Sequence, residues 1–193
     1  MIKEKELLLA KIGRCLNESN VLWGVGASMM LYYKGLVKEP KDIDFIVDKK
    51  DIEKVDRLLS ELGEKTVREK SSFYATTYFY EYNIDGIEVD VMCEFTICNH
   101  GLQYLYDFNE QSVVEMAEIE GEQIPFTGLE DWYVLYQIMP GREQRVNLIE
   151  DFFVKNGVSH PNLLIKMKEQ VLPEFILQNI DRLLLQENSR LGS

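Results

Sequence analysis

Hydrophobic residues recur along the chain with two different periods, and each period predicts a different kind of element. Leu8, Ile12 and Leu16 follow one another at four-residue steps among charged residues, which is typical of an amphipathic helix over residues 2–18. The stretch 42–47 instead alternates polar and apolar positions, as expected of a β-strand. The chain is therefore predicted to contain both helices and strands.

The same patterns predict the remaining elements. Strands are expected at 21–25, 66–70, 73–82 and 86–95, with a hairpin over 113–125. Helices are expected at 27–34 and 51–62, and then around 132–139, 146–153, 161–171 and 174–186. Asp85-Gly86 is a hairpin turn signal, and Asp51 is expected to cap the helix that follows it. This order divides the chain into an α/β half, residues 1–125, and a helical region, residues 126–193.

Composition narrows the class of protein. With 193 residues, 46% of them apolar, and only five prolines, the chain suits one medium globular domain with a helical appendage, and not a disordered or fibrous protein. Its three cysteines are an odd number without a C-x-x-C pair, which indicates a reduced, cytoplasmic environment. No segment reaches the roughly 18 apolar residues of a membrane span, so no membrane association is expected.

The charge distribution argues against nucleic acid as a partner. The net charge is −12, and residues 71–141 hold thirteen acidic residues without any Lys or Arg. Binding to a phosphate backbone requires clustered cations, because neutralised phosphates and released counterions supply the sequence-independent affinity. A broad nucleic-acid surface in the middle of the chain is therefore not expected.

Three aspartates form the first candidate site. Residues two apart on a strand point to the same face, so Asp42 and Asp44 project together. Two neighbouring carboxylates repel each other, and a divalent cation removes that conflict; oxygen ligands suit Mg²⁺ or Mn²⁺. Asp90 lies on another strand-like run, and it completes a two-metal site if the two strands are neighbours.

A phosphate-binding turn is predicted just before the aspartate pair. The strand at 21–25 leads into Gly26-Ala27-Ser28 at the start of a helix, where free N–H groups and the helix dipole favour anions. Gly26 would allow a phosphate to approach closely, and the Ser28 hydroxyl can donate a hydrogen bond to it. Nucleotide binding is therefore predicted for both residues.

A triphosphate also needs cations. Lys38 and Lys41 lie beside the aspartate pair, while Arg142 and Arg145 end the stretch that lacks basic residues. Lys41 and Arg142 are the residues that we predict to bind the nucleotide. For Arg142 the alternative is an ion pair with one of the acids Glu130 and Asp131.

Taken in order, these motifs resemble the nucleotidyltransferase superfamily of the DNA polymerase beta type, in its small bacterial branch. The motif runs Val25-Gly26-Ala27-Ser28, thirteen residues, Asp42-Ile43-Asp44, and then Val89-Asp90-Val91. The downstream segments Ile124-Pro125-Phe126, Leu129-Glu130-Asp131-Trp132 and Gly141-Arg142 are also similar to the entry into the family's C-terminal helices. The family commonly has Gly-Gly or Gly-Ser where this chain has Ala27 between Gly26 and Ser28. The resemblance covers about residues 20–155, and the last forty residues match nothing recognised.

The resemblance implies an α+β fold with a mixed β-sheet flanked by helices and followed by a C-terminal helical region. It also implies transfer of a nucleoside monophosphate from an NTP to an acceptor hydroxyl, with release of pyrophosphate. Asp42 and Asp44 would hold Mg²⁺ or Mn²⁺ together with the triphosphate, and Asp90 would bind the catalytic metal and help to deprotonate the acceptor. The acidic composition suits a small cationic acceptor of the kind that antibiotic adenylyltransferases modify.

Two other functions remain open. The same fold could transfer nucleotides to tRNA or protein in a toxin–antitoxin setting, or it could be a non-catalytic nucleotide-binding module. The C-terminal helices are compatible both with closure over the acceptor and with a homodimer interface.

Two further groups of residues have both a functional and a structural interpretation. Glu88 shares a strand face with Asp90, and it is either an additional ligand or an ordinary edge carboxylate. Four tyrosines alternate along the 73–82 run and either stack on a base or acceptor, or simply follow strand patterning. They are Tyr74, Tyr78, Tyr80 and Tyr82.

Overall fold

The computed structural model describes residues 2–66, 73–99 and 101–191. The strands are β1 (Trp23–Val25), β2 (Ile43–Val47), β3 (Glu64–Thr66), β4 (Tyr78–Ile84), β5 (Ile87–Cys93), β6 (Thr96–Asn99), β7 (Leu102–Leu105), β8 (Val113–Ile119) and β9 (Glu122–Thr127). The helices are α1 (Ile2–Glu18), α2 (Ala27–Tyr33), α3 (Ile52–Ser60), α4 (Leu129–Ile138), α5 (Glu143–Asn156), α6 (Pro161–Met167) and α7 (Glu174–Leu191), with short 3-10 turns η1 (Lys49–Asp51) and η2 (Glu110–Ser112). Most predicted elements are present, with boundaries moved by a few residues.

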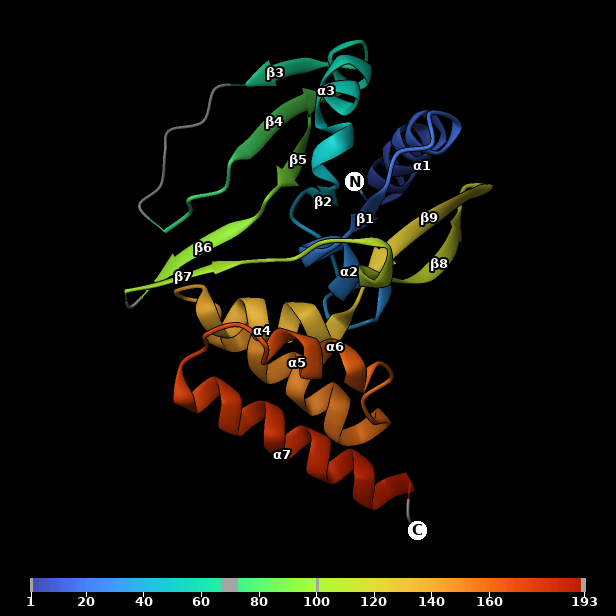
Figure 1. The fold of residues 1–193 in the computed structure, drawn as a ribbon. Coiled ribbons are helices and arrows are strands. Elements are labelled where there is room, and N and C mark those ends of the chain that lie inside the picture. The colour runs from blue at the N-terminus through green and yellow to red at the C-terminus, as the bar shows by residue number, and fades with distance from the viewer. Residues whose placement is uncertain (1, 67–72, 100, 192–193) are drawn as a thin grey trace.

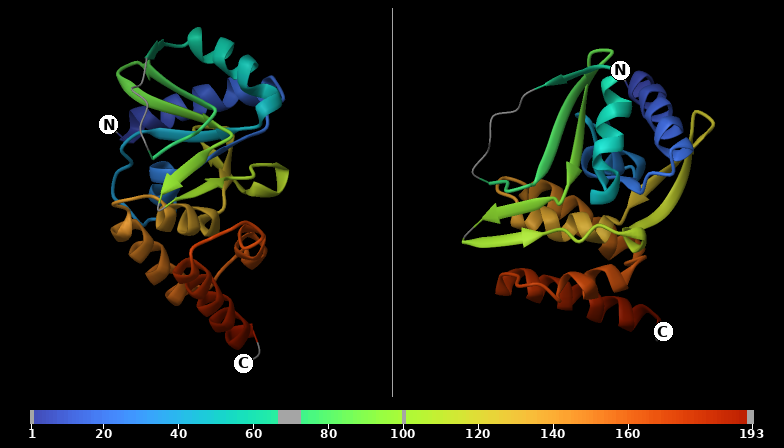
Figure 2. Two further views of the ribbon diagram at one scale, coloured as in Figure 1. Left: turned by 60° about the vertical axis from the view of Figure 1, so that its left-hand side comes forward. Right: turned by 45° about the horizontal axis from the view of Figure 1, so that its top comes forward.

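A seven-stranded mixed sheet forms the centre of the fold, in the order β3-β4-β5-β2-β1-β9-β8. Strands β2 and β5 are parallel neighbours, as are β1 and β9, while the other pairs are antiparallel. The helices α1 and α3 lie together at one side of the sheet, and α4 to α7 are gathered at the other (Figure 1). Figure 2 shows the same separation from two other directions. The predicted α+β fold, a mixed sheet flanked by helices and followed by C-terminal helices, is confirmed.

The core forms because the apolar side chains of the central strands face the helices. Trp23 and Phe45 meet edge to face with ring centroids 5.5 Å apart, and both are almost fully buried. Ile12 and Leu16 of α1 are completely buried with them, as the four-residue spacing predicted. The turn at Asp85-Gly86 has positive φ at both positions, 54° and 81°, which is the geometry of a tight hairpin.

Three predictions about local structure need correction. Asp51 makes no side-chain cap on α3; Asp48 instead caps η1, by accepting a hydrogen bond from the N–H of Lys50. The predicted strand 73–82 begins only at Tyr78, because Tyr74 forms an isolated bridge with Ile97. The hairpin of β6 and β7 is a second, two-stranded sheet that no pattern predicted.

The predicted strand at 66–70 lies mostly outside the described residues. Within the described residues, no helix is both long enough and apolar enough to cross a bilayer.

Candidate active site

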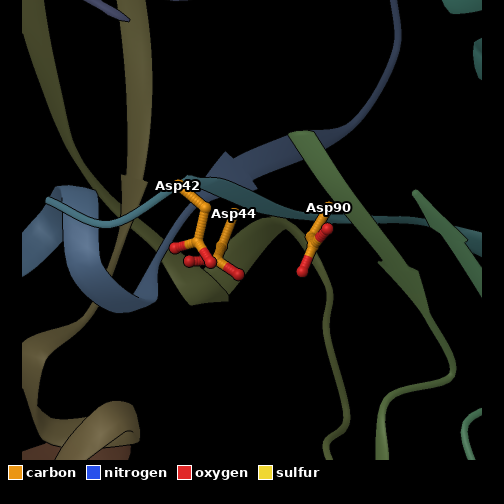
Figure 3. Close-up of side chains that lie close together, drawn as sticks. All are labelled: Asp42, Asp44 and Asp90. Carbon is orange, nitrogen blue, oxygen red and sulfur yellow. The ribbon is translucent and has the colours of Figure 1, made fainter. Parts of the chain in front are cut away.

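The three predicted aspartates come together on neighbouring strands of the sheet. Asp42 directly precedes β2, Asp44 lies on β2, and Asp90 lies opposite Asp44 in the parallel register of β2 and β5. One carboxylate oxygen of each lies within 4.8 Å of the others (Figure 3). Because residues opposite one another in a sheet share a face, this register alone brings the two strands' carboxylates to the same side.

The negative charges of the three carboxyl groups in this cluster are only partly neutralised by neighbouring residues. Burial raises the pKa of Asp44 well above its usual range, and the neighbouring charges of Asp42 and Asp90 add to the effect, while Arg145 opposes it. Burial also raises the pKa of Asp42, but hydrogen bonds from Asp44, Lys41 and Ser28 outweigh it, so that this pKa is lowered. The carboxyl groups thus share a proton, or a cation, more readily than they ionise together. Three carboxylates at this spacing are the all-oxygen donor set that fits Mg²⁺ or Mn²⁺.

Ser28 and Lys41 both hold Asp42. The Ser28 hydroxyl donates a hydrogen bond to Asp42 Oδ1 at 3.0 Å, and it accepts one from the backbone N–H of Lys41 at 3.2 Å. The Lys41 ammonium donates to Asp42 Oδ2 at 3.0 Å and lies 3.5 Å from a carboxylate oxygen of Glu88. Two of the four predicted nucleotide-binding residues are therefore adjacent to the carboxylate cluster. Glu88 itself lies outside the cluster and pairs with Lys41.

The turn at Gly26 is built differently from the prediction. Its N–H is not free, because it donates to the carbonyl oxygen of Asp44 at 3.0 Å. A Cβ at Gly26 would lie 2.2 Å from Cζ2 of the Trp132 indole, so close packing explains the glycine at this position. Ala27 has a positive φ of 45°, in the left-handed region that glycine adopts most easily.

A cavity of about 230 Å³ opens beside the three aspartates. Its walls come from α2, β2, β4, β5, α4, the start of α5 and the segments that flank them. The residues that line it are Ala27, Lys41, Asp42, Asp44, Tyr74, Phe79, Asp90, Met92, Phe95, Trp132, Tyr136, Met139, Arg142 and Arg145. The lining thus contains three positively and three negatively charged side chains, and its other residues are mainly aromatic.

Two arginines reach this cavity. Arg145 is fixed in place, because it donates to the Tyr136 hydroxyl at 2.8 Å and its guanidinium lies 5.1 Å from the centre of that ring. Arg142 also lines the cavity. Its alternative partners are engaged elsewhere: Glu130 accepts from the His160 N–H at 2.8 Å, and Asp131 accepts from the Tyr106 hydroxyl. Lys38 is not among the lining residues.

The alternating tyrosines prove to be mainly structural. The hydroxyl of the buried Tyr82 donates to Asp56 of α3, and the Lys65 ammonium lies 3.3 Å from the centre of the Tyr80 ring. On the opposite face of the same strand, Phe79 lines the cavity, together with Tyr74 from the segment before it. Of the four tyrosines only Tyr74 is among the described residues that line the cavity. Sequence reasoning missed Phe79 and Met92, which look like ordinary core residues in the sequence.

The fold and the carboxylate site together define the class of protein. A mixed sheet that presents three clustered aspartates beside a Gly-Ala-Ser helix start is the arrangement of nucleotidyltransferases of the DNA polymerase beta type. The chain belongs to a particular family of that class, because the model of the aminoglycoside-2''-adenylyltransferase family matches residues 8–153. No curated protein matches the chain.

Solved structures show the same fold. A Thermotoga maritima protein provisionally described as a nucleotidyltransferase is 27% identical, with a TM-score of 0.61, and the match covers 81% of this chain and 97% of that one. The crystal structure of ANT(2'')-Ia in complex with adenylyl-2''-tobramycin is 14% identical, with a TM-score of 0.56, covering 97% and 99% of the two chains. An antigenic nucleotidyltransferase-like protein from Paracoccidioides brasiliensis is 13% identical, with a TM-score of 0.50, covering 97% and 89%. At these identities, the last two show the fold alone.

Proposed function

We propose that the protein is a metal-dependent nucleotidyltransferase that moves a nucleoside monophosphate from an NTP to a hydroxyl of a small acceptor and releases pyrophosphate. The observation that carries the proposal is the cluster of Asp42, Asp44 and Asp90, with carboxylate oxygens within 4.8 Å of one another. The family description favours ATP as the NTP. We place the reaction in the cytoplasm.

In this proposal each of the three aspartates has a defined role. Asp42 and Asp44 hold the metals and, through them, the triphosphate, while Asp90 holds the catalytic metal and receives the proton of the acceptor hydroxyl. Two bound Mg²⁺ or Mn²⁺ ions supply positive charge to the attacking and leaving oxygens. A bond forms between the acceptor oxygen and the α-phosphorus, and the bond from the α-phosphorus to pyrophosphate breaks. Catalysis of this kind depends mainly on positioning and charge stabilisation.

The phosphates need cations on the cavity wall, and three support this assignment. Lys41 lies beside Asp42, and Arg142 and Arg145 also line the cavity. The Ser28 hydroxyl and the backbone around Gly26 adjoin the same end of the cluster as Lys41. Since phosphates prefer several converging donors, we propose that Gly26, Ser28, Lys41 and Arg142 bind the nucleotide, with Arg145 as a fifth contact.

The division of the chain at residue 125 is part of the proposal. Residues 1–125 contribute the carboxylates, and residues 126–193 contribute the wall from Trp132 to Arg145, which supports a nucleotide site between an α/β core and a helical region. The family description and the ANT(2'')-Ia complex make aminoglycosides the first acceptors to test.

Substitution of a single carboxylate oxygen tests the proposal. We expect Asp44→Asn to reduce pyrophosphate release from Mg·ATP and an acceptor by at least ~100-fold, because a neutral amide neither binds the metals nor balances their charge. The matched control is Asp85→Asn, in the exposed turn at the far end of the β4–β5 hairpin, where asparagine suits the positive φ. An unchanged rate in Asp44→Asn would show that the metal site is wrongly assigned.

Two further measurements separate the two alternative functions. Label from the α-phosphate that accumulates on tRNA or protein in a lysate, and not on small acceptors, would favour the toxin–antitoxin type of reaction. Stabilisation by Mg·ATP without turnover of any acceptor would favour a non-catalytic nucleotide-binding module.

A further inference from the structure

Two arginines occupy an electrostatically unfavourable position at the start of α5. Arg142 is the N-cap of this helix and Arg145 lies in its first turn, where Glu143 supplies one negative charge against two positive ones. The helix dipole is positive at this end and disfavours cations there. Both arginines nevertheless line the cavity. Such a conflict with a local rule is typical of a functional site, and a bound anion resolves it. In the proposed function, on which this inference rests, that anion is the triphosphate.

Tyr136 of α4 holds one of these arginines in a single position. Its hydroxyl accepts a hydrogen bond from Arg145 Nη1 at 2.8 Å, and the guanidinium lies 5.1 Å from the centre of its ring. The tyrosine itself is almost completely buried and lines the cavity. An arginine side chain has several rotatable bonds, and ordering it on a ligand costs entropy. The hydrogen bond and the ring contact order Arg145 before any ligand arrives.

Tyr136 is in turn fixed to the strand that leads into the predicted phosphate-binding turn. Its ring packs against that of Trp132 with centroids 5.3 Å apart. The Trp132 indole N–H donates to the Thr127 hydroxyl at 2.8 Å, and this hydroxyl donates to the carbonyl oxygen of Val25 at 3.0 Å. Val25 is the last residue of β1. This series of buried contacts therefore sets the position of Arg145 relative to the turn after β1.

The charges of these groups show that Arg145 and Tyr136 lie near Asp44. Burial raises the pKa of Tyr136; the charge of Arg145 opposes this rise, and the charge of Asp44 adds to it. Arg145 also opposes the rise in the pKa of Asp44 that burial causes. Asp44 is the carboxylate assigned to both metals and, through them, to the triphosphate. Arg145 is therefore held at the end of the cavity where the phosphates would bind.

We propose that Tyr136 is a positioning residue for the nucleotide: its hydroxyl holds the Arg145 guanidinium in the place where it contacts the triphosphate. Tyr136 acts through Arg145 and not by contact with the nucleotide. Without the hydroxyl, Arg145 keeps its charge but must be ordered when the nucleotide binds, so the affinity for Mg·ATP falls. Binding of the acceptor does not depend on this pair.

Calorimetric titration of the full chain with Mg·ATP tests the proposal. Tyr136→Phe removes only the hydroxyl and keeps the ring, and we expect the Kd to rise about tenfold, as for the loss of one charge-assisted hydrogen bond. Arg145→Ala removes the charge as well and should raise the Kd by about a hundredfold. The double variant should bind as weakly as Arg145→Ala and no more weakly, because the hydroxyl then has no arginine to hold. With tobramycin as acceptor, the KM for tobramycin should be unchanged in Tyr136→Phe.

The matched control is Tyr133→Phe, on the same helix. The Tyr133 hydroxyl is also buried and also connects α4 to α5, since it donates to Glu150 at 3.0 Å, but Tyr133 is not among the described residues that line the cavity. A merely structural role for these hydroxyls predicts similar effects of both substitutions. The proposed role predicts an unchanged Kd for Mg·ATP in Tyr133→Phe.

Three results would overturn the proposal. They are an unchanged Kd in Tyr136→Phe, an equal rise in the Tyr133→Phe control, and additive losses in the double variant, which would show that Tyr136 contacts the nucleotide directly. Binding of Mg·ATP without turnover of any acceptor would contradict the proposed nucleotidyltransferase function, while the comparison of Kd values still decides the role of Tyr136. No binding of Mg·ATP by the unchanged protein would contradict both.

Discussion

Asp131, in the first turn of α4, shows at the scale of one residue how burial changes an ionisable group. Its side chain is almost completely enclosed, with only 2% of the residue exposed, and it accepts a hydrogen bond from the Tyr106 hydroxyl. Burial raises the pKa of Asp131 to about 7; Glu130 adds to the rise, whereas the bond from Tyr106 and the charge of Lys166 oppose it. At a pH between about 4, the ordinary pKa of an aspartate, and the raised pKa of Asp131, the folded protein holds a proton that the unfolded chain has lost.

This shift predicts a pH-dependent stability. Because the pKa of Asp131 is higher in the folded protein, its contribution to stability is greatest when the pH is below the pKa in the unfolded chain. This contribution is lost as the pH rises towards 7. Asp131→Asn has no charge to bury, so its free energy of unfolding relative to the unchanged protein should rise by about 2–3 kcal/mol between pH 5 and pH 8. Urea unfolding at several pH values measures this. The half-exposed Asp181→Asn, as a control, should keep the original pH profile, and a parallel profile in Asp131→Asn would contradict the assignment.

At the scale of elements, Asp51 connects two segments that lie far apart in the sequence. Its buried carboxylate accepts the N–H of Leu22, just before β1, at 3.1 Å, and it pairs with Lys54 of α3 at 3.1 Å. The prediction from sequence was a local helix cap, and the observed bond spans 29 residues instead. The carboxylate therefore fixes where β1 begins relative to α3. This placement also supports the strand that leads into Gly26.

The two aspartates of this loop should differ in their effect on stability. Asp51→Ala leaves the Leu22 N–H without its partner in a partly buried position and removes the partner of Lys54, and we expect a loss of about 2–3 kcal/mol in the free energy of unfolding. Asp48→Ala removes only the cap of η1 and should cost about 1 kcal/mol. Thermal and urea unfolding of both variants measure the difference, and equal losses would contradict the long-range role of Asp51.

At the scale of the whole molecule, the net charge of −12 acts in two ways. Its general repulsion opposes the compact state and is weakened by any salt. The cluster of Asp42, Asp44 and Asp90 is a local concentration of the same charge, which only a cation bound at that place relieves fully. Salt and a specific divalent ion should therefore have separable effects on stability.

Calorimetry at constant ionic strength should separate these effects. We expect Mg²⁺ to raise the Tm of the protein above its value in KCl, because an ion that binds only the folded state stabilises it, by about 2.7 kcal/mol at a hundred times its Kd. Asp44→Asn should have a higher Tm in KCl, because a neutral amide avoids the cost of burying this carboxyl group beside Asp42 and Asp90, and it should lose the additional gain from Mg²⁺. Equal gains from Mg²⁺ in both proteins would exclude the cluster as the binding site.

Local sequence was sufficient for the features that depend on neighbouring residues. The period of four in α1 and the Asp85-Gly86 turn could be predicted because each depends on interactions within a few residues. The shared face of Asp42 and Asp44 follows from the geometry of any strand. Asp90 was predicted as their partner from the order of the motifs, and the parallel pairing of β2 with β5 provides the physical reason.

Tertiary structure alone decided which groups meet across the fold. The β6–β7 sheet, the packing of Gly26 against Trp132 and the bond between Arg145 and Tyr136 all join segments that no local pattern relates. The alternation of a strand places Phe79 and its tyrosine neighbours on opposite faces of β4. Only the tertiary structure shows that α3 packs on the tyrosine face and that the face with Phe79 lines the cavity. The sequence by itself was therefore sufficient to predict the class of protein and the three aspartates of the site. The walls around them, and with these the choice of acceptor, depend on contacts between distant segments that form only when the chain folds.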